Sequence, residues 1–384
     1  MINSGGFEIS KQLPFYWRLK ELGAPSFEIP EKLPFEFSVS DDGLLIQTRN
    51  QATLNALEKV YGLDYNIGYI QEGYEIATGY VNDFKEFLER YLDALPKNSF
   101  LVEIGCGGAL LLNEFAGRYN VLGIDPSPTA IRAGEKYGIR IIPEFFSPKL
   151  LDSQVDFIFH SDVLEHAFDP DQFLREQYDA LAPGGIVAIS IPDATQSIQV
   201  GDISLAMHQH LQYYSLDSLR FALERVGFEI LTVEQAKYGG SLYAAGKKSH
   251  QIQPSKSYRT EDEPDFEKFR TSLTRFRNQL KTDIASGQTI GFYVPLRTLP
   301  YLSALNIDMG NECKFRFFDD TEHWKSKMFD GTVIPIESFQ EMVSNPPEVV
   351  YIMSLTFASL IRKKIHSELN QSIQVRELLD IISA

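Results

Sequence analysis

The sequence predicts an α/β protein with a doubly wound, seven-stranded sheet, a second and smaller α/β domain, and an N-terminal extension. From Phe100 onward, short apolar runs alternate with helical patterns, which is typical of a mainly parallel sheet covered on both faces. A polar segment from Lys247 to Asp265 interrupts this alternation, and a shorter alternation follows it. Residues 1–50 are rich in Pro, Phe and Glu and carry only short alternating runs.

Each predicted strand of the first sheet is a short apolar run. A helical pattern with three- and four-residue spacing precedes them, from about Gly73 to Leu95. The runs, in order, are FLVEI, NVLGI, IRII, VDFIFH, GIVAISI, FEILTV and SLYAAG. Only a loop separates the last two runs, so we expect them to form a hairpin in which one strand is antiparallel.

The second alternation begins with a helix on which Phe266, Phe269, Leu273, Phe276 and Leu280 form one stripe. Four strand-like runs follow it: TIGFYV, KFRFFD, TVIPI and EVVYIMS. We therefore divide the chain into an N-terminal extension with its helix (1–97), a first α/β domain (98–248), a linker (249–265) and a second α/β domain (266–384).

Composition excludes several classes of function. The 384 residues carry 36 Lys+Arg and 52 Asp+Glu, a net charge of −16, which argues against a nucleic-acid partner. No stretch reaches 18 uninterrupted apolar residues, and the N-terminus lacks the pattern of a secretory signal, so we expect no membrane partner and a cytoplasmic location. The only cysteines are Cys106 and Cys313, too few for a disulfide framework or a four-cysteine zinc site.

A glycine-rich turn, VEIGCGGAL at 102–110, follows the first predicted strand of the sheet. Glycine lets the backbone turn sharply and approach a ligand, and the amides at the following helix start favour polar or anionic groups. Asp125 ends the second strand, about 20 residues after Gly105, where an acid can accept hydrogen bonds from both hydroxyls of a ribose. The paired signal predicts a ligand that contains a nucleoside.

The turn resembles motif I of the class I S-adenosylmethionine-dependent methyltransferases, E/D-x-G-x-G-x-G, with Ala109 at the third glycine. The run at 156–166 (DFIFHSDVLEH) and the LAPGG turn at 181–185 are similar to further motifs of that family. The resemblance implies S-adenosylmethionine as cofactor. It implies these contacts: Glu103, Gly105, Cys106, Gly107, Asp125, Pro126, Glu144, Phe145, Phe146 and Ser161.

Over most of its length the chain resembles the sugar C-methyltransferases that act on nucleotide-linked deoxysugars. That family has an N-terminal zinc ribbon, a tyrosine-rich approach segment, the methyltransferase core and a C-terminal Rossmann-like domain. The approach segment resembles 61–69 (YGLDYNIGY), which adds Tyr65 and Tyr69 as cofactor contacts, although both could equally be core aromatics. The ribbon's cysteines are missing, since 39–47 reads VSDDGLLIQ, and we expect no metal.

The family's active-site run resembles 207–215 (MHQHLQYYS). His210 stands at the general-base position, with Gln209 in place of the carboxylate and Met207 in place of the tyrosine. We expect His210, His208 and Tyr214 to be the catalytic residues, although His210 could instead serve packing. His160 is a weaker candidate for a contact near the methyl group, and His166 is expected to be structural.

The resulting prediction is methyl transfer to a small molecule, a sugar nucleotide or a related intermediate, at carbon or oxygen. The lost carboxylate weakens C-methylation more than O-methylation, because a carbon acid is the harder group to deprotonate. An NAD-type oxidoreductase and a non-catalytic interaction protein remain as alternatives. A sugar nucleotide would need a basic patch, for which Arg270, Arg275, Arg277 and Arg297 are candidates, and the sequence allows a homodimer without requiring one.

Overall fold

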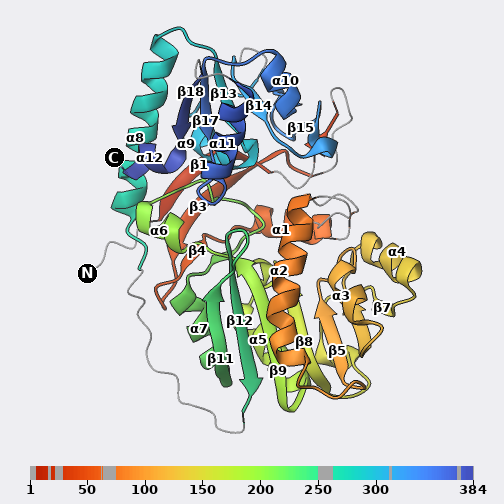
Figure 1. Ribbon diagram of the computed structural model, residues 1–384. Helices are drawn as coiled ribbons and strands as arrows, with labels where there is room; N and C mark the ends of the chain where they lie inside the picture. The colour runs from red at the N-terminus through yellow and green to blue at the C-terminus, as the bar shows by residue number, and fades with distance from the viewer. Residues whose placement is uncertain are drawn as a thin grey trace.

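The computed structural model describes residues 6–15, 19–21, 29–61, 63, 75–249, 263–310, 314–369 and 373–383. Two α/β units lie one above the other, with an N-terminal antiparallel sheet and helix α1 (Gln51–Tyr61) between them (Figure 1). Most of the predicted linker and the residues Tyr65, Tyr69 and Cys313 lie outside the described residues.

The first unit contains a seven-stranded sheet of order β11-β12-β9-β8-β5-β6-β7. Its strands are β5 (Phe100–Ile104), β6 (Asn120–Ile124), β7 (Ile141–Ile142), β8 (Val155–Ser161), β9 (Leu181–Pro192), β11 (Phe228–Gln235) and β12 (Ser241–Lys248). Strands β5 to β9 pair parallel with one another, and β12 pairs antiparallel with both β9 and β11, so β12 alone runs opposite to the other strands of this sheet. The predicted mainly parallel α/β sheet is confirmed, as is its terminal hairpin.

Helices cover both faces of this sheet because successive strand residues point to opposite sides. In β8, Phe157 and Phe159 pack in the same cluster as helix α2, whereas Val155 and Ile158 pack in the cluster of α5 and α7. The helices are α2 (Glu75–Leu92), α3 (Leu110–Phe115), α4 (Pro128–Tyr137), α5 (Pro170–Ala180), α6 (Thr195–Val200) and α7 (Leu216–Glu224). Short 3-10 helices occupy Pro148–Leu150 (η1) and Leu164–His166 (η2).

The C-terminal unit is a five-stranded parallel sheet of order β16-β14-β13-β17-β18. Its strands are β13 (Ile290–Tyr293), β14 (Arg316–Phe318), β16 (Ile336–Glu337), β17 (Val349–Ile352) and β18 (Gln374–Glu377). Its helices are α8 (Phe266–Ala285), α9 (Pro295–Ala304), α10 (Phe339–Ser344), α11 (Ala358–Glu368) and α12 (Leu378–Ser383), with η3 at Glu322–Trp324. Neither β18 nor α12 was predicted from the sequence, because the β18 run (QVRE) is mostly polar and α12 (LLDIIS) is only 6 residues long.

The N-terminal sheet has the order β1-β3-β4-β10 and is antiparallel. It joins β1 (Phe7–Pro14), β3 (Lys32–Val39) and β4 (Leu45–Gln47) to β10 (Gln212–Tyr213), which comes from the first α/β unit. A short pair, β2 (Leu19–Lys20) with β15 (Met328–Phe329), ties the same region to the C-terminal unit. The N-terminal residues are therefore held by both units.

Packing of aromatic side chains holds this sheet against the C-terminal unit. Phe7, Phe35 and Phe37 share one buried cluster with Phe269 and Phe276 of α8. This shared core makes the N-terminal sheet part of the interface between the two α/β units.

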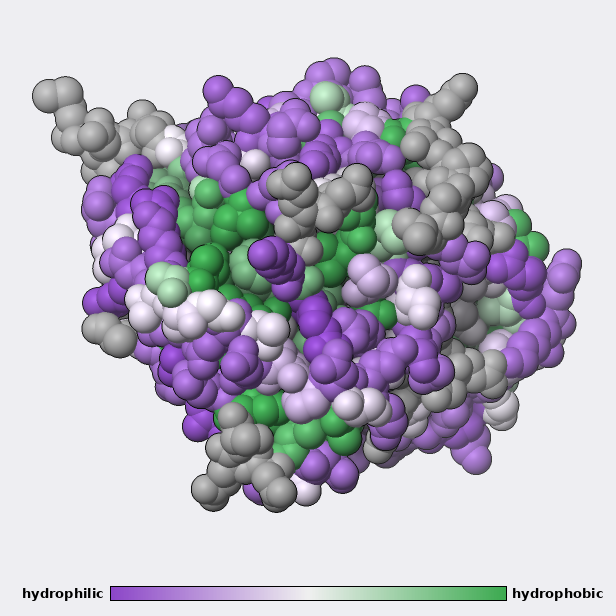
Figure 2. Space-filling view, turned by 90° about the horizontal axis from the view of Figure 1, so that it is seen from above, coloured by the Kyte–Doolittle hydropathy of each residue, from purple (hydrophilic) through white to green (hydrophobic). Residues whose placement is uncertain are grey.

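The outer surface is mainly polar. Seen from above, hydrophilic residues form most of the rim, and apolar residues gather near the middle of the face (Figure 2). In the described part of the chain, no helix is long and apolar enough to cross a membrane.

Substitution of Phe37 tests whether the N-terminal sheet and the two α/β units share one core. Phe37 is 0% exposed and packs against Phe35, Tyr213 and Phe269 at ring separations of 5.0, 5.3 and 5.7 Å. We expect Phe37→Ala to lower the free energy of unfolding by about 3–5 kcal/mol, measured by urea denaturation, because it leaves a cavity among three segments. Leu360→Ala is the control, since Leu360 is 60% exposed and its loss should change stability by less than about 0.5 kcal/mol. Equal effects of the two changes would contradict a shared core.

Candidate functional site

The glycine turn lies between β5 and α3, at the carboxyl edge of the first sheet. Gly105 and Gly107 have φ angles of 68° and 46°, which L-residues with a side chain rarely adopt. A Cβ at Gly105 would also lie 2.6 Å from Cγ2 of Val163, so the turn has no room for a side chain. Ala109, at the third glycine position, takes a left-handed φ of 51° as well.

Asp125 lies directly against this turn, as the spacing predicts. Its Oδ2 accepts the Gly107 N–H at 2.8 Å and its Oδ1 accepts the Ser127 N–H at 2.8 Å. Each carboxylate oxygen retains a lone pair for a ligand hydroxyl. Pro126 follows it and leads into α4, whose first turn Ser127 caps.

Two buried groups flank the turn. Glu103 is buried, burial raises its pKa well above the usual range, and its Oε2 has no hydrogen-bond partner among the described residues. Cys106 is also buried, and burial raises the pKa of its thiol. A Cβ built on Gly123 would lie 2.6 Å from Sγ of Cys106, so the thiol packs against β6. A buried thiol with a raised pKa is not a nucleophile.

The residues at the carboxyl ends of β7 and β8 lie around the edge of the site. Glu144 and Phe145 follow β7 and are exposed, the Phe145 ring by 65%. Phe146 instead turns inward and packs edge-on against Phe173 at 6.3 Å. Ser161 ends β8, and its hydroxyl donates to the Asp162 carboxylate at 3.4 Å.

A cluster of two histidines and a glutamate lies at the same edge. Glu165 and His166 belong to η2, and His210 comes from the loop before β10. The Nε2 atoms of His166 and His210 lie 3.7 and 4.0 Å from Oε1 of Glu165, and the two rings are 5.0 Å apart. Nδ1 of His166 donates to the Gln209 carbonyl oxygen at 2.7 Å, which leaves the lone pair of that ring on Nε2.

Burial controls the charge of this cluster. It raises the pKa of Glu165 well above its usual range, with a further contribution from Asp162. It lowers the pKa of His166 to about 4, and it lowers that of His210 well below 6.5 with help from His166 and Arg297. Both imidazoles are therefore neutral at neutral pH and able to accept a proton. Neither oxygen of Glu165 has a hydrogen-bond partner among the described residues.

The N-terminal sheet holds the loop that carries His210. The side-chain amide of Gln47 in β4 donates to the carbonyl oxygens of His208 and His210, at 3.0 and 3.2 Å. The backbone of Gln47 donates to Leu211, and Leu211 in turn donates to the carbonyl oxygen of Glu165 at 2.8 Å. One chain of bonds thus connects the N-terminal sheet, His210 and Glu165.

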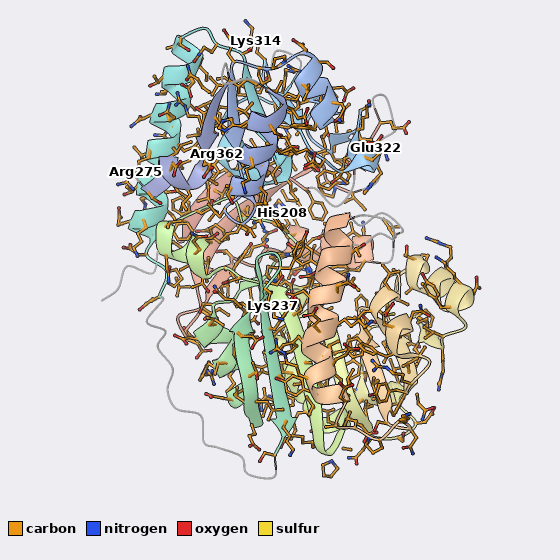
Figure 3. The ribbon with its side chains drawn as sticks, in the orientation of Figure 1. His208, Lys237, Arg275, Lys314, Glu322 and Arg362 are labelled. Atoms are coloured by element: carbon orange, nitrogen blue, oxygen red, sulfur yellow. The ribbon has the colours of Figure 1, made fainter. Side chains whose placement is uncertain are left out.

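The structure separates the other expected catalytic residues from His210. His208 is buried between the two α/β units (Figure 3), with its ring edge-on to Phe15 and Phe35 at 5.4 Å and its Nε2 donating to the Leu33 carbonyl oxygen. Tyr214 is 2% exposed and belongs to the core beneath the first sheet. These two side chains serve packing, because their neighbours leave no access to a ligand.

The structure also changes the roles expected of His160 and His166, and it adds Glu165 to the site. His160 is 0% exposed and packs on Phe173 at 5.5 Å, so it belongs to the core. His166, expected to be structural, faces His210. The sequence analysis missed Glu165, although an acid beside a histidine just after a buried strand is a usable signal.

Glu165, His166 and His210 could also hold a metal ion, because one ligand atom from each lies within 4.8 Å of the others. A histidine pair with one carboxylate is a common ligand set for divalent metals. Since the sequence analysis expected no metal, an experiment on His210 has to distinguish a metal centre from a proton-accepting cluster.

Comparison with known proteins shows which proteins this chain resembles. Residues 77–233 match the family model described as "Methyltransferase domain". C-methyltransferase NovU from Streptomyces niveus is 24% identical over 290 residues, which cover 69% of this chain and 68% of that protein. A ubiquinone biosynthesis O-methyltransferase from Methylobacterium sp. (strain 4-46) is 34% identical over 94 residues, which cover 22% of this chain and only 38% of the relative.

Two solved structures are similar at low levels. One is the N-methyltransferase NodS from Bradyrhizobium japonicum WM9 with S-adenosylhomocysteine (TM-score 0.39, 18% identity, 51% of this chain and 97% of that one). The other is the 1,6-didemethyltoxoflavin-N1-methyltransferase of Burkholderia thailandensis (TM-score 0.41, 14% identity, 59% and 100%).

The family match decides against the NAD-type oxidoreductase that the sequence analysis had kept as an alternative. It agrees with the glycine turn, with Asp125 beside it and with the mainly parallel sheet. The family model thus assigns a methyltransferase domain to residues 77–233, and the enzyme activity that it indicates is S-adenosylmethionine-dependent methyl transfer.

Proposed function

We propose that the protein methylates a nucleotide-linked sugar or a related biosynthetic small molecule, with His210 as the general base. The observation that carries the proposal is the buried Glu165, whose oxygens lack a partner among the described residues and whose Oε1 lies 4.0 Å from Nε2 of His210. A carboxylate at this distance can stabilise the imidazolium that forms when His210 takes a proton.

The turn at the carboxyl edge of β5 fits S-adenosylmethionine. Gly105 and Gly107 hold the left-handed backbone of the turn, and Asp125 retains acceptor capacity for ribose hydroxyls. The unpartnered Oε2 of Glu103 offers an acceptor for a cationic group. The exposed ring of Phe145 and the carboxylate of Glu144 suit the adenine side of the site. When bound, the cofactor supplies an electrophilic methyl group on a sulfonium.

Glu165 also bears on the acceptor atom. Gln209 replaces the carboxylate that the resembled family places next to its histidine, which spoke against C-methylation. Glu165 supplies a carboxylate to the same histidine from a different element, η2. This restores the pairing that a base needs to remove a proton from carbon, so we favour C-methylation, and the likeness to a C-methyltransferase supports that choice.

The cofactor site can be tested by calorimetry with S-adenosylhomocysteine. We expect Asp125→Ala to weaken binding roughly 10- to 100-fold, because hydrogen bonds to a charged acceptor contribute about 1.5–3 kcal/mol. Asp125→Asn, which keeps one acceptor oxygen, should lose less. Asp152→Ala is the matched control, since that side chain is 84% exposed. Unchanged binding by Asp125→Ala would contradict the ribose assignment, and no binding by the unmodified protein would overturn the proposed function.

The role of His210 as the base can be tested by measuring the transfer of a labelled methyl group from S-adenosylmethionine to nucleotide-linked keto- and hydroxy-sugars. We expect His210→Ala to lower kcat by roughly 10²–10⁴ while S-adenosylhomocysteine still binds. His366→Ala, an exposed histidine on α11, is the control. The assay is run with and without EDTA. Unchanged turnover in His210→Ala would contradict the base, and activity lost to EDTA and restored by a divalent metal would make the cluster a metal centre.

The pH dependence gives a separate check on His210. Its pKa in the folded protein lies well below 6.5, so it stays neutral and competent as pH falls through 6.5 and is protonated only at lower pH. We therefore expect the acidic limb of kcat/KM to lie well below pH 6.5. His166→Gln should move that limb to higher pH, because His166 contributes to the lowered pKa, whereas His366→Gln should leave it in place. A limb near 6.5 that neither variant moves would contradict the assignment.

A further inference from the structure

The cluster of Glu165, His166 and His210 has the composition and the spacing of a metal site. Oε1 of Glu165 lies 3.7 Å from Nε2 of His166 and 4.0 Å from Nε2 of His210, and one ligand atom from each residue lies within 4.8 Å of the others. Ligand atoms around a tetrahedral ion lie about 3.4 Å apart, because each is about 2.0–2.2 Å from the ion. Both distances to Glu165 exceed that spacing by less than about 1 Å, which a small rotation of either ring can close.

Glu165 is the member of the cluster that most needs a partner. Its side chain is 2% exposed, and neither of its oxygens has a hydrogen-bond partner among the described residues. Buried polar side chains are normally hydrogen-bonded, and buried charges are normally paired or bound to a metal. The unpartnered carboxyl group, directed at two imidazole nitrogens, therefore points to a cation as its ligand.

His166 is oriented as a metal-binding histidine is. Its Nδ1 donates to the Gln209 carbonyl oxygen at 2.7 Å, which leaves the ring's lone pair on Nε2, the atom that faces Glu165. Metal-binding imidazoles commonly donate their other ring N–H to a backbone carbonyl, because that bond fixes the tautomer and the direction of the ring. The ring also packs edge-on against Tyr61 of α1 at 6.1 Å, so it is held from two sides.

Backbone contacts hold the cluster together, and one side of it is open to solvent. Leu211 donates its N–H to the carbonyl oxygen of Glu165 at 2.8 Å, and the Gln47 side chain donates to the carbonyl oxygen of His210 at 3.2 Å. The side chains of His166 and His210 are 20% and 14% exposed. An ion can therefore enter from the histidine side, as a metal site requires, while Glu165 stays enclosed.

The charges around the cluster favour a cation over an anion. The carboxyl group of Asp162 acts on Glu165, and the guanidinium of Arg297 acts on His210. A divalent cation would be attracted by two carboxyl groups and repelled by one guanidinium, in a protein whose net charge is −16.

Two imidazole nitrogens and one carboxylate select a first-row divalent ion such as Zn²⁺, whereas Mg²⁺ and Ca²⁺ prefer oxygen ligands. We propose that Glu165, His166 and His210 bind Zn²⁺ or a similar ion, and that this ion inhibits methyl transfer by taking the lone pair of His210. An imidazole bound to a metal through one nitrogen carries its proton on the other, so it can no longer accept a proton from the acceptor. The inhibition rests on the proposed function, whereas the binding rests on the geometry of the cluster alone.

Ion binding can be tested by calorimetry of the full chain, stripped with EDTA and dialysed, with ZnCl₂ as the probe. We expect one tight Zn²⁺ site per chain, which MgCl₂ does not occupy. Glu165→Gln and His166→Gln should each weaken binding by more than about 100-fold, since the loss of an outer partner of a ligand already costs about 10- to 100-fold. His366→Gln is the matched control, because His366 is an exposed histidine on α11. Binding of S-adenosylhomocysteine without zinc verifies that the variants fold.

Inhibition can be tested with the methyl-transfer assay. Protein stripped with EDTA should keep its turnover, added Zn²⁺ should lower it, and renewed EDTA should restore it. We expect His166→Gln to need more than about 100-fold more Zn²⁺ for the same fractional inhibition, because the ion has lost one ligand. His366→Gln should respond to Zn²⁺ as the unmodified protein does.

The outcomes separate this inference from the proposed function. Equal Zn²⁺ binding by the unmodified protein, Glu165→Gln and His166→Gln would mark the ion as adventitious and overturn the site, leaving the base role of His210 untouched. Zn²⁺ binding at the cluster without inhibition would overturn the competition for His210. Turnover that requires a metal would overturn both the inhibitory role and the base, and failure to bind S-adenosylhomocysteine would overturn the proposed function itself.

Discussion

The pairing of β10 with β4 is the interaction on which the site depends. These strands contribute only Gln212–Tyr213 and Leu45–Gln47, yet they connect the first α/β unit to the N-terminal sheet. Gln47 holds the backbone of His208 and His210 from the side, and Leu211 is bonded to Glu165. Because backbone bonds define where a loop runs, this short ladder sets the position of His210 relative to Glu165 and His166.

The cluster combines groups whose charge burial suppresses. An enclosed carboxylate without a partner and two neutral imidazoles form an arrangement that is costly for stability and useful for proton transfer. Removal of a proton from a substrate by His210 would leave an imidazolium 4.0 Å from Oε1 of Glu165, and that positive charge favours the ionised form of a carboxyl group whose pKa burial raises. The same enclosure keeps His210 available as a base across neutral pH.

Packing against both α/β units holds the N-terminal sheet in place. Its aromatic residues enter a core shared with α8 and β13, and Lys20 pairs with the buried Asp330 at 3.0 Å. A sheet of short strands is marginal alone, and here its hydrophobic face is covered by both units. The division between the units is therefore filled by residues from the beginning of the chain.

The sequence by itself determined the features that depend on neighbours along the chain. Alternating strands and helices predicted the mainly parallel sheet, and the spacing between Gly105 and Asp125 predicted their contact, because a β-α-β connection brings consecutive carboxyl ends together. Only the tertiary structure decided the neighbourhood of His210. Glu165 and His210 stand 45 positions apart, and His208 donates to a carbonyl oxygen 175 positions earlier. His208 and His210 are two positions apart in the sequence, yet the aromatic rings of Phe15 and Phe35 enclose His208, whereas His210 lies beside Glu165 and His166. Contacts between distant segments carry no local period, which is why the sequence could name His210 but not the carboxylate beside it.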